Sequence, residues 1–159
     1  ILFFINIEYM QNAICFSTKF GWITATEQKN KITSIRFKKS SKQGKTSFLL
    51  NKLKNDINLF FKGETKLINL PLKIEGNMIQ KKIWNELRKI KKGKTKSYKE
   101  IAKKFKLSPR YIGKICGQNQ HILAIPCHRI IRSDGSLAGF SATGGKNLKR
   151  KLLEFEKNK

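Results

Sequence analysis

Two helix-start signals stand close together in the second half of the chain, and they constrain its fold more than any other feature. Ser97 lies three residues before a glutamate, the spacing of a capping box, and predicts a short helix over 98–105. Ser108 precedes Pro109, a residue suited to the first helical position, where its missing N–H has no partner to lose, and predicts a helix over 109–117. Two short helices joined by a tight turn predict a helix-turn-helix, although helix pairs of this kind also occur as plain core packing.

Residue patterns predict further helices and strands on both sides of the middle of the chain. Apolar residues at helical spacing predict one helix over 47–62, with Gly63 as its stop, and another over 79–90, with Gly93 after it. Segments rich in β-branched and aromatic residues, separated by polar breaks, predict strands over 13–17, 22–26 and 32–37.

These elements divide the chain into a sheet-containing part and a helical part. The segment 64–77, which contains a proline and a glycine, is the expected linker. We therefore predict an α/β (α+β) fold with two domains. Residues 1–75 form a small N-terminal domain with a mixed sheet, and residues 76–159 form a mostly helical C-terminal domain that contains the helix-turn-helix.

The charge of the chain is strongly positive. The sequence has 35 Lys and Arg against 10 Asp and Glu, a formal net charge of +25. Residues 1–75 hold 13 basic and 5 acidic side chains, whereas residues 76–159 hold 22 and 5. A polyanion would relieve the self-repulsion, so nucleic acid is the first candidate partner and an anionic membrane surface the second. A Lys-rich composition throughout is the alternative explanation. The hydrophobic share of 39% excludes general disorder.

The three cysteines, Cys15, Cys116 and Cys127, predict reduced thiols. Their number is odd and no Cys-x-x-Cys pair occurs, so a disulfide framework is not expected. No apolar run approaches the ~18 residues of a membrane span. The apolar residues 1–7 have no basic stretch before them, so we expect neither a signal peptide nor a membrane partner. A cytoplasmic location is the resulting expectation.

The segment 122–131, Ile-Leu-Ala-Ile-Pro-Cys-His-Arg-Ile-Ile, carries the most chemical information. An apolar run precedes Cys127, which is expected to lie in a turn where Pro126 fixes one backbone dihedral. His128 and Arg129 follow, and positive groups near a cysteine favour the thiolate, its nucleophilic form. The alternative is an inert buried thiol beside a buried, hydrogen-bonded histidine.

The same region contains four side chains of metal-binding type. Their spacing along the chain does not match the common zinc motifs, so no metal is expected. They are Cys116, His121, Cys127 and His128.

The chain around this cysteine resembles the O6-alkylguanine-DNA alkyltransferase family. Residues 125–131, Ile-Pro-Cys-His-Arg-Ile-Ile, are similar to its active-site signature. The resemblance covers 76–157 well and extends more loosely to Phe20-Gly-Trp-Ile and Ile32-Thr-Ser-Ile-Arg-Phe. It implies a ribonuclease H-like N-terminal domain and a winged-helix-like C-terminal domain. Other pieces that agree in order and spacing are Ile83-Trp84, Gly93-Lys-Thr-Lys-Ser97-Tyr98, Ser108-Pro-Arg110, Asn119, Asp134-Gly-Ser-Leu-Ala-Gly139-Phe140-Ser141 and Leu152-Leu-Glu-Phe-Glu156.

The resemblance implies direct reversal of DNA damage by a suicide enzyme. Cys127 would accept the methyl or other alkyl group of O6-methylguanine, with O4-methylthymine as a second substrate that the family suggests. The thioether is stable, so each molecule would act once, and no cofactor is implied. His128 resembles the base that takes the thiol proton through a water, and Glu156 the residue that orients it, with Glu154 as the alternative register. Asn119 resembles the brace of the turn before the cysteine.

The partner that the resemblance implies is double-stranded DNA containing O6-alkylguanine, whose base must be flipped out of the duplex. Tyr98 resembles the residue that presses on the target phosphate and bonds the base. Arg110 resembles the residue that fills the vacated stack while its helix enters the minor groove. The Ser141 N–H and the carbonyls of Cys127 and Ile130 would contact the base.

Some positions depart from the family pattern and bear on alkyl size and DNA affinity. Phe140 stands where many members have Tyr, which removes a hydroxyl from the pocket wall. Tyr111 and Lys114 flank Gly113 on the second helix of the helix-turn-helix, where small residues are frequent. Gly113 itself suits either a close backbone approach or plain helix packing, since a glycine inside a helix is otherwise unfavourable.

Three other functions are alternatives. A non-catalytic alkyltransferase-like protein would bind the lesion but lack the cysteine. A plain helix-turn-helix regulator would not need the Pro-Cys-His-Arg turn, and a cysteine hydrolase would turn over repeatedly. A monomer is expected.

Overall fold

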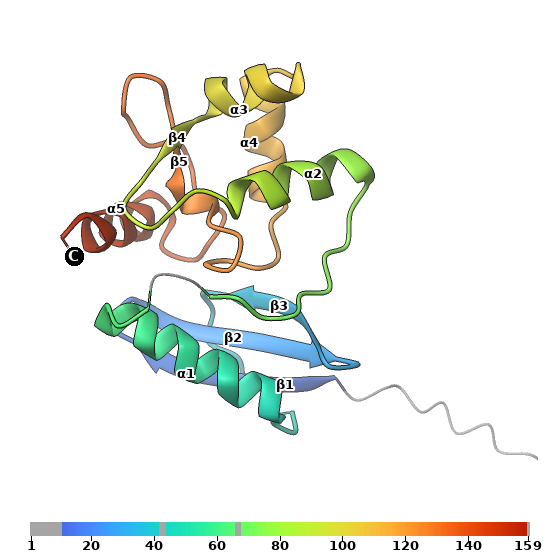
Figure 1. The fold of residues 1–159 in the computed structure, drawn as a ribbon. Coiled ribbons are helices and arrows are strands. Elements are labelled where there is room, and N and C mark those ends of the chain that lie inside the picture. Colours follow the sequence, from blue (N-terminus) through green and yellow to red (C-terminus); the bar gives the residue numbers. More distant parts are fainter. Residues whose placement is uncertain (1–10, 42–43, 66–67, 159) are drawn as a thin grey trace, which may run out of the picture.

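The computed structural model describes residues 11–41, 44–65 and 68–158, and its N-terminal part is built on a three-stranded sheet (Figure 1). The strands are antiparallel neighbours in the order β1-β2-β3. Lys29 and Asn30 both have positive φ and form a two-residue turn whose twist suits a hairpin. The strands are β1 (Asn12–Thr18), β2 (Gly21–Gln28) and β3 (Lys31–Arg36).

The outer edge of β3 is paired with two segments from elsewhere in the chain. Isolated parallel bridges join Ile32 to Leu72 and Ile35 to His121. These bridges lie outside the pairing among the three strands, which is antiparallel throughout and not mixed as predicted. The second bridge matters for the site, because it ties β3 to the loop that leads to Cys127.

Helix α1 (Phe48–Lys62) covers one face of this sheet (Figure 1). Ser47 caps it by accepting the N–H of Leu50 at 3.1 Å. Gly63 ends it with a φ of 81°, a conformation that glycine adopts without a Cβ clash. Its buried side chains are those that the helical spacing picks out: Leu49, Leu50, Leu53, Ile57, Phe60 and Phe61.

The C-terminal part contains the predicted helix-turn-helix. Both cap predictions are confirmed, because the side chain of Ser97 accepts the N–H of Glu100 and that of Ser108 accepts the N–H of Tyr111. The elements of this part are α2 (Met78–Leu87), β4 (Lys96–Ser97), α3 (Tyr98–Phe105), α4 (Pro109–Gly117), the 3-10 turn η1 (Cys127–Arg129), β5 (Ile130–Ile131) and α5 (Gly145–Lys157).

Two local features differ from the sequence-based expectation. Helix α2 ends at Leu87, whereas the apolar spacing runs on to Ile90, which is buried in the turn that follows. The parallel pair β4 and β5 was not expected, because strands of two residues have no readable period.

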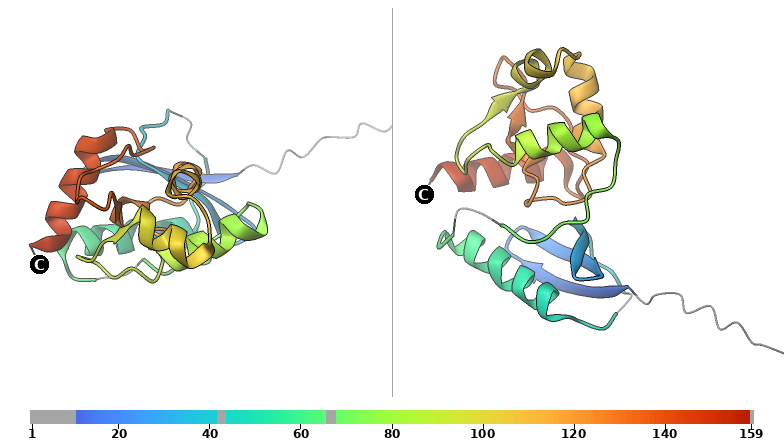
Figure 2. Two further views of the ribbon diagram at one scale, coloured as in Figure 1. Left: turned by 90° about the horizontal axis from the view of Figure 1, so that it is seen from above. Right: turned by 45° about the vertical axis from the view of Figure 1, so that its right-hand side comes forward.

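Helix α5 and the loop before Cys127 pack against the sheet part as well as against the helical part (Figure 2). Ile122, Leu123 and Leu152 belong to the same buried cluster as the sheet. The Phe155 ring lies 5.5 Å from that of Phe20, centre to centre. The apolar core therefore crosses the expected division at residues 75 and 76, and that division stays a prediction.

No helix in the described ranges is long and apolar enough to cross a membrane.

Candidate active site

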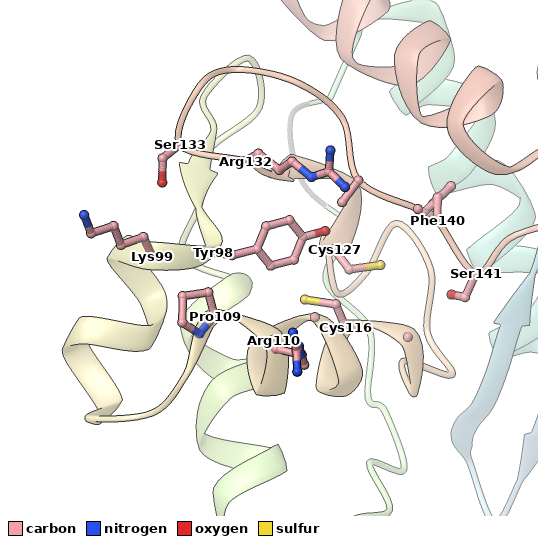
Figure 3. Close-up of a pocket in the computed structure, with 14 residues that line it drawn as sticks. Tyr98, Lys99, Pro109, Arg110, Cys116, Cys127, Arg132, Ser133, Phe140 and Ser141 are labelled. Atoms are coloured by element: carbon pink, nitrogen blue, oxygen red, sulfur yellow. The ribbon is translucent and has the colours of Figure 1, made fainter.

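A mostly apolar cavity of about 750 Å³ lies between the helix-turn-helix and the segment 132–141 (Figure 3). The Tyr98 ring points across it towards Cys127. Cys116, from α4, also lines the cavity. The cavity brings together six of the residues that the sequence singles out: Tyr98, Arg110, Gly113, Cys127, Phe140 and Ser141.

Cys127 begins the 3-10 turn at the inner end of this cavity. Its side chain is only 3% exposed. The carbonyl of Cys127 accepts the N–H of Ile130, which closes the turn. The sulfur is therefore carried by a short hydrogen-bonded turn and lies at the wall of the cavity.

Asn119 holds both the sulfur and the chain before it. Its Nδ2 donates to Cys127 Sγ at 3.1 Å and to the Ile125 carbonyl at 2.8 Å. Its Oδ1 accepts the backbone N–H of His121 at 2.8 Å. With these bonds the amide orientation is defined, and Asn119 connects the sulfur to the loop that pairs with β3.

His128 lies behind the cysteine in contact with Glu156 on α5. The His128 Nε2 to Glu156 Oε1 distance is 2.7 Å, and the two residues are 0% and 2% exposed. Glu154, the alternative register, is exposed. The Nδ1 atom of His128 is buried and has no hydrogen-bond partner within the described ranges. This leaves Nδ1 as the ring atom that can take up a proton.

The Arg129 guanidinium is bonded to Glu156 and not to Cys127, although Arg129 is close to Cys127 in sequence. Its Nε and Nη2 both donate to Glu156 at 2.9 Å, and its Nη1 donates to the Ile90 carbonyl at 2.6 Å. The prediction that Arg129 favours the Cys127 thiolate is therefore wrong. The 3-10 turn sends the guanidinium away from the sulfur, and its charge compensates the buried carboxylate instead.

Burial and hydrogen bonding set the protonation states of the His128–Glu156 pair. Burial raises the pKa of Glu156, but hydrogen bonds from His128 and Arg129 outweigh it and bring this pKa down to about 2. Burial lowers the pKa of His128, more than Glu156 raises it. The pair at neutral pH is therefore a neutral imidazole held by an ionised carboxylate.

The thiol of Cys127 is protonated at rest. Burial raises its pKa, although the hydrogen bond from Asn119 and the charge of Lys149 act in the other direction. Sequence reasoning expected a thiolate, and the structure corrects this for the resting protein. Loss of the thiol proton has to accompany the reaction.

Lys149 is the functional residue that the sequence analysis missed. It is 1% exposed, and its Nζ donates to the Tyr98 hydroxyl at 3.3 Å. Burial lowers its pKa, while the two thiols near it, Cys127 and Cys116, raise it. A signal was present, because a lysine at this position of α5 shares the face of Leu152 and Glu156 at spacings of 3 and 7 residues.

Three of the predicted residues, Ile130, Tyr111 and Lys114, do not line the cavity. Ile130 is completely buried in the core of the helical part. On α4, Lys114 is exposed and Tyr111 is half-buried against that core. Gly113 stands beside the Tyr98 ring, where an added Cβ would lie 3.8 Å from it. A side chain at position 113 would therefore make an ordinary van der Waals contact with Tyr98.

No group of three or more His, Cys, Asp or Glu side chains comes together in a way that could hold a metal ion in the described part of the chain.

Fold and site together define a class of protein: a helix-turn-helix that presents a cysteine thiol, backed by a histidine–glutamate pair, in an open cavity. The family model for the DNA-binding domain of 6-O-methylguanine DNA methyltransferase matches residues 78–158. The chain belongs to this family.

Curated relatives agree with this assignment. A methylated-DNA–protein-cysteine methyltransferase of Metallosphaera sedula is 35% identical over 147 residues, which cover 89% of this chain and 90% of the relative. One from Sulfolobus acidocaldarius is 44% identical over 97 residues, 61% of each chain.

Solved structures show the same fold. The crystal structure of Mycobacterium tuberculosis O6-methylguanine methyltransferase matches with a TM-score of 0.83 at 28% identity, covering 94% of both chains. A crystal structure of the Mycobacterium tuberculosis protein in complex with DNA matches with a TM-score of 0.83 at 28% identity, covering 92% of this chain and 93% of that one.

Proposed function

We propose that this chain repairs DNA by moving the methyl group of O6-methylguanine onto Cys127. DNA is its partner, and the reaction is the direct reversal after which its curated relatives are named. The observation that carries the assignment to a residue is the Cys127 thiol. It lines the cavity, it accepts a hydrogen bond from Asn119, and the next residue in the chain, His128, is paired with Glu156.

The reaction is a displacement at the methyl carbon. The bond from sulfur to carbon forms, the bond from carbon to guanine O6 breaks, and the electron pair of that bond leaves with the base. The proton of the thiol goes to His128 Nδ1 through a water, and a proton returns to the guanine. Atoms and charge balance without a cofactor. The thioether persists, so one molecule repairs one lesion.

His128 suits the base in this scheme because its imidazole is neutral. Ionised Glu156 accepts from Nε2, which fixes the tautomer that leaves a lone pair on Nδ1. When Nδ1 takes the proton, the buried carboxylate stabilises the imidazolium that forms. This is the arrangement of nucleophile, base and orienting group that activates a weak nucleophile.

The cavity fits a nucleobase flipped out of the duplex. Tyr98 and Phe140 provide apolar surfaces of the cavity, and Ser141 lines it as well (Figure 3). Arg110, exposed at the start of α4, fills the space that the base leaves in the stack. We also propose that O6-alkylguanine is the specific lesion, that the protein acts as a monomer and that it is located in the cytoplasm.

Intact-mass measurement tests the reaction directly. The protein is mixed with a duplex carrying one O6-methylguanine, and a gain of one methyl group is expected, mapped to the peptide that contains Cys127. A matched duplex with unmodified guanine is the control. Repeated turnover, or a methyl group on another residue, would contradict the proposal.

Lys149→Met tests the electrostatic part of the site. The lysine charge favours the Cys127 thiolate, so its loss raises the pKa of that thiol and moves the rise of the transfer rate to higher pH. Single-turnover rates across a pH series measure this. Lys146→Met removes an exposed charge from the same helix and is expected to leave the profile in place. A slower Lys149→Met protein with an unshifted profile would count against this role.

Arg110→Ala tests base flipping. An Arg that replaces a flipped base in the stack contributes about 1–3 kcal/mol, so binding of the lesion duplex is expected to weaken by roughly 5- to 150-fold. Fluorescence anisotropy with lesion-bearing and undamaged duplexes measures the effect, and the lesion duplex is expected to lose more. Lys103→Ala removes an exposed charge from α3 and serves as the control. If Arg110→Ala and Lys103→Ala lose equal affinity for the lesion duplex, Arg110 acts only as a contact to phosphate.

A further inference from the structure

The imidazole of His121 lies where three segments of the chain meet. Its Nε2 is 3.0 Å from the carbonyl oxygen of Ile32 in β3. The same oxygen accepts the backbone N–H of Lys73, on the way to α2, at 2.8 Å. A carbonyl is only an acceptor, so the Nε2 atom carries the hydrogen and donates it. His121 is 2% exposed, and burial lowers its pKa, so the ring is neutral at physiological pH.

The backbone of His121 continues this connection to the reacting sulfur. Its N–H donates to Asn119 Oδ1 and its carbonyl accepts the N–H of Ile125, both at 2.8 Å. The Nδ2 of Asn119 in turn donates to Cys127 Sγ at 3.1 Å. A short chain of hydrogen bonds therefore runs from the sheet to the nucleophile.

The loop that contains His121 stores backbone strain and has to be held from outside. Leu123 has a φ of 75°, in the left-handed region that a residue with a Cβ seldom adopts, and such a conformation persists only where surrounding contacts determine it. On the sheet side two backbone bonds hold the loop: Ile35 donates to the Gln120 carbonyl, and Ile122 donates to the Ile35 carbonyl. Two side-chain contacts lie at the same edge: Arg36 donates to the side-chain oxygen of Gln120, and the His121 ring, which is buried, donates to the Ile32 carbonyl.

We propose that His121 is a positioning residue for the transfer reaction, whose hydrogen bond to β3 keeps the Asn119 amide in register with the Cys127 sulfur. It acts through Asn119 and does not touch the reacting atoms. The sheet part thereby contributes to the rate of a reaction whose chemical groups all lie in the other half of the chain. This inference rests on the proposed function.

Two amide substitutions separate the hydrogen bond from the mere presence of a polar side chain. His121→Gln places an N–H near the position of the imidazole Nε2, whereas the shorter His121→Asn does not reach the Ile32 carbonyl. A cavity of about 350 Å³ beside His121 gives both side chains room. His121→Leu removes the donor altogether while keeping an apolar volume.

The measurement is the single-turnover rate of methyl transfer at saturating O6-methylguanine duplex, together with duplex affinity. We expect His121→Asn and His121→Leu to transfer about tenfold more slowly and His121→Gln to stay within about twofold of the unaltered protein, as the loss or retention of one buried hydrogen bond implies. Affinity is expected to stay within about twofold for all three, because the ring bonds to β3 and does not line the cavity beside the DNA-binding helix α4.

Ile57→Val is the control for stability, since it removes one buried methyl group from α1 without touching the loop. It is expected to lower the melting temperature and leave the rate unchanged. Three results would overturn the proposal: unchanged rates in both His121→Asn and His121→Leu, no recovery in His121→Gln, or equal slowing by Ile57→Val. If the unaltered chain itself transfers no methyl group to Cys127, the proposed function has failed instead.

Discussion

Cys127→Ser is expected to abolish methyl transfer while duplex binding stays close to that of the unaltered protein. Serine preserves the size and the hydrogen-bonding pattern at position 127, so Asn119 keeps a partner. A hydroxyl is a far weaker nucleophile than a thiol at neutral pH. His128 is a strong enough base to deprotonate the thiol but not the less acidic hydroxyl. Transfer from a radiolabelled duplex and binding by anisotropy measure the two properties separately.

Cys116→Ser is the matched control for this substitution. Cys116 lines the same cavity, but burial raises the pKa of its thiol to about 12, and neither Asn119 nor His128 activates it. We expect full transfer from this variant. Two results would contradict Cys127 as the acceptor. One is transfer of radiolabel to the Cys127→Ser protein, and the other is loss of transfer in the Cys116→Ser protein but not in the Cys127→Ser protein.

Glu156→Ala is expected to be the most destabilising single change in the site. Glu156 accepts hydrogen bonds from His128, Arg129 and the backbone N–H of Gly93, all within 3.2 Å. Its removal leaves the 4% exposed Arg129 guanidinium without a counter-charge. Breaking a buried ion pair in this way costs about 3–5 kcal/mol. Denaturant unfolding measures the loss in the free energy of unfolding.

Two further variants make this experiment specific. Glu154→Ala removes an exposed carboxylate two residues away and is expected to change stability by less than about 0.5 kcal/mol. Glu156→Gln keeps the shape of the side chain but not its charge. This variant is expected to have a higher free energy of unfolding than the alanine variant and still to transfer the methyl group slowly. A stable, fully active Glu156→Ala protein would exclude the orienting role.

The same pair predicts how stability depends on pH. The pKa of Glu156 is lower in the folded state, about 2, than its ordinary value of 4.5, so the folded state binds fewer protons in this range. Its contribution is therefore fully present above the ordinary value and is lost as the pH falls towards about 2. The lowered pKa of His128 acts in the same direction, beginning near its ordinary value of 6.5. Replacing Glu156 should flatten the part of this dependence that lies below its ordinary value of 4.5 and leave the His128 part in place, because Glu156 raises the pKa of His128.

The parts of the fold that were predictable from sequence are those with local causes. The caps at Ser97 and Ser108 depend on residues within one helical turn, and both helices begin where the caps indicate. The apolar face of α1 follows from spacing alone. By contrast, β4 and β5 depend on a pairing between segments more than thirty residues apart, and no local pattern announces it.

The site shows the same division. The Pro-Cys-His-Arg turn and the resemblance that it carries pointed to Cys127, and they also pointed to Glu156 rather than to Glu154. The prediction that Arg129 acts on the Cys127 sulfur was wrong, because side chains that are neighbours in sequence point in different directions in a 3-10 turn. Lys149 and His121 were not assigned a role, because each acquires it only from partners brought in by folding.

The sequence by itself determined where helices start, which faces are apolar, and which cysteine sits in a reactive motif, because these depend on neighbours along the chain. The tertiary structure alone decided that the thiol is protonated at rest, that a lysine charge lies near it, and that β3 is bonded to the loop before it. Burial and long-range hydrogen bonds set a pKa and a position, and both arise only when distant segments pack together.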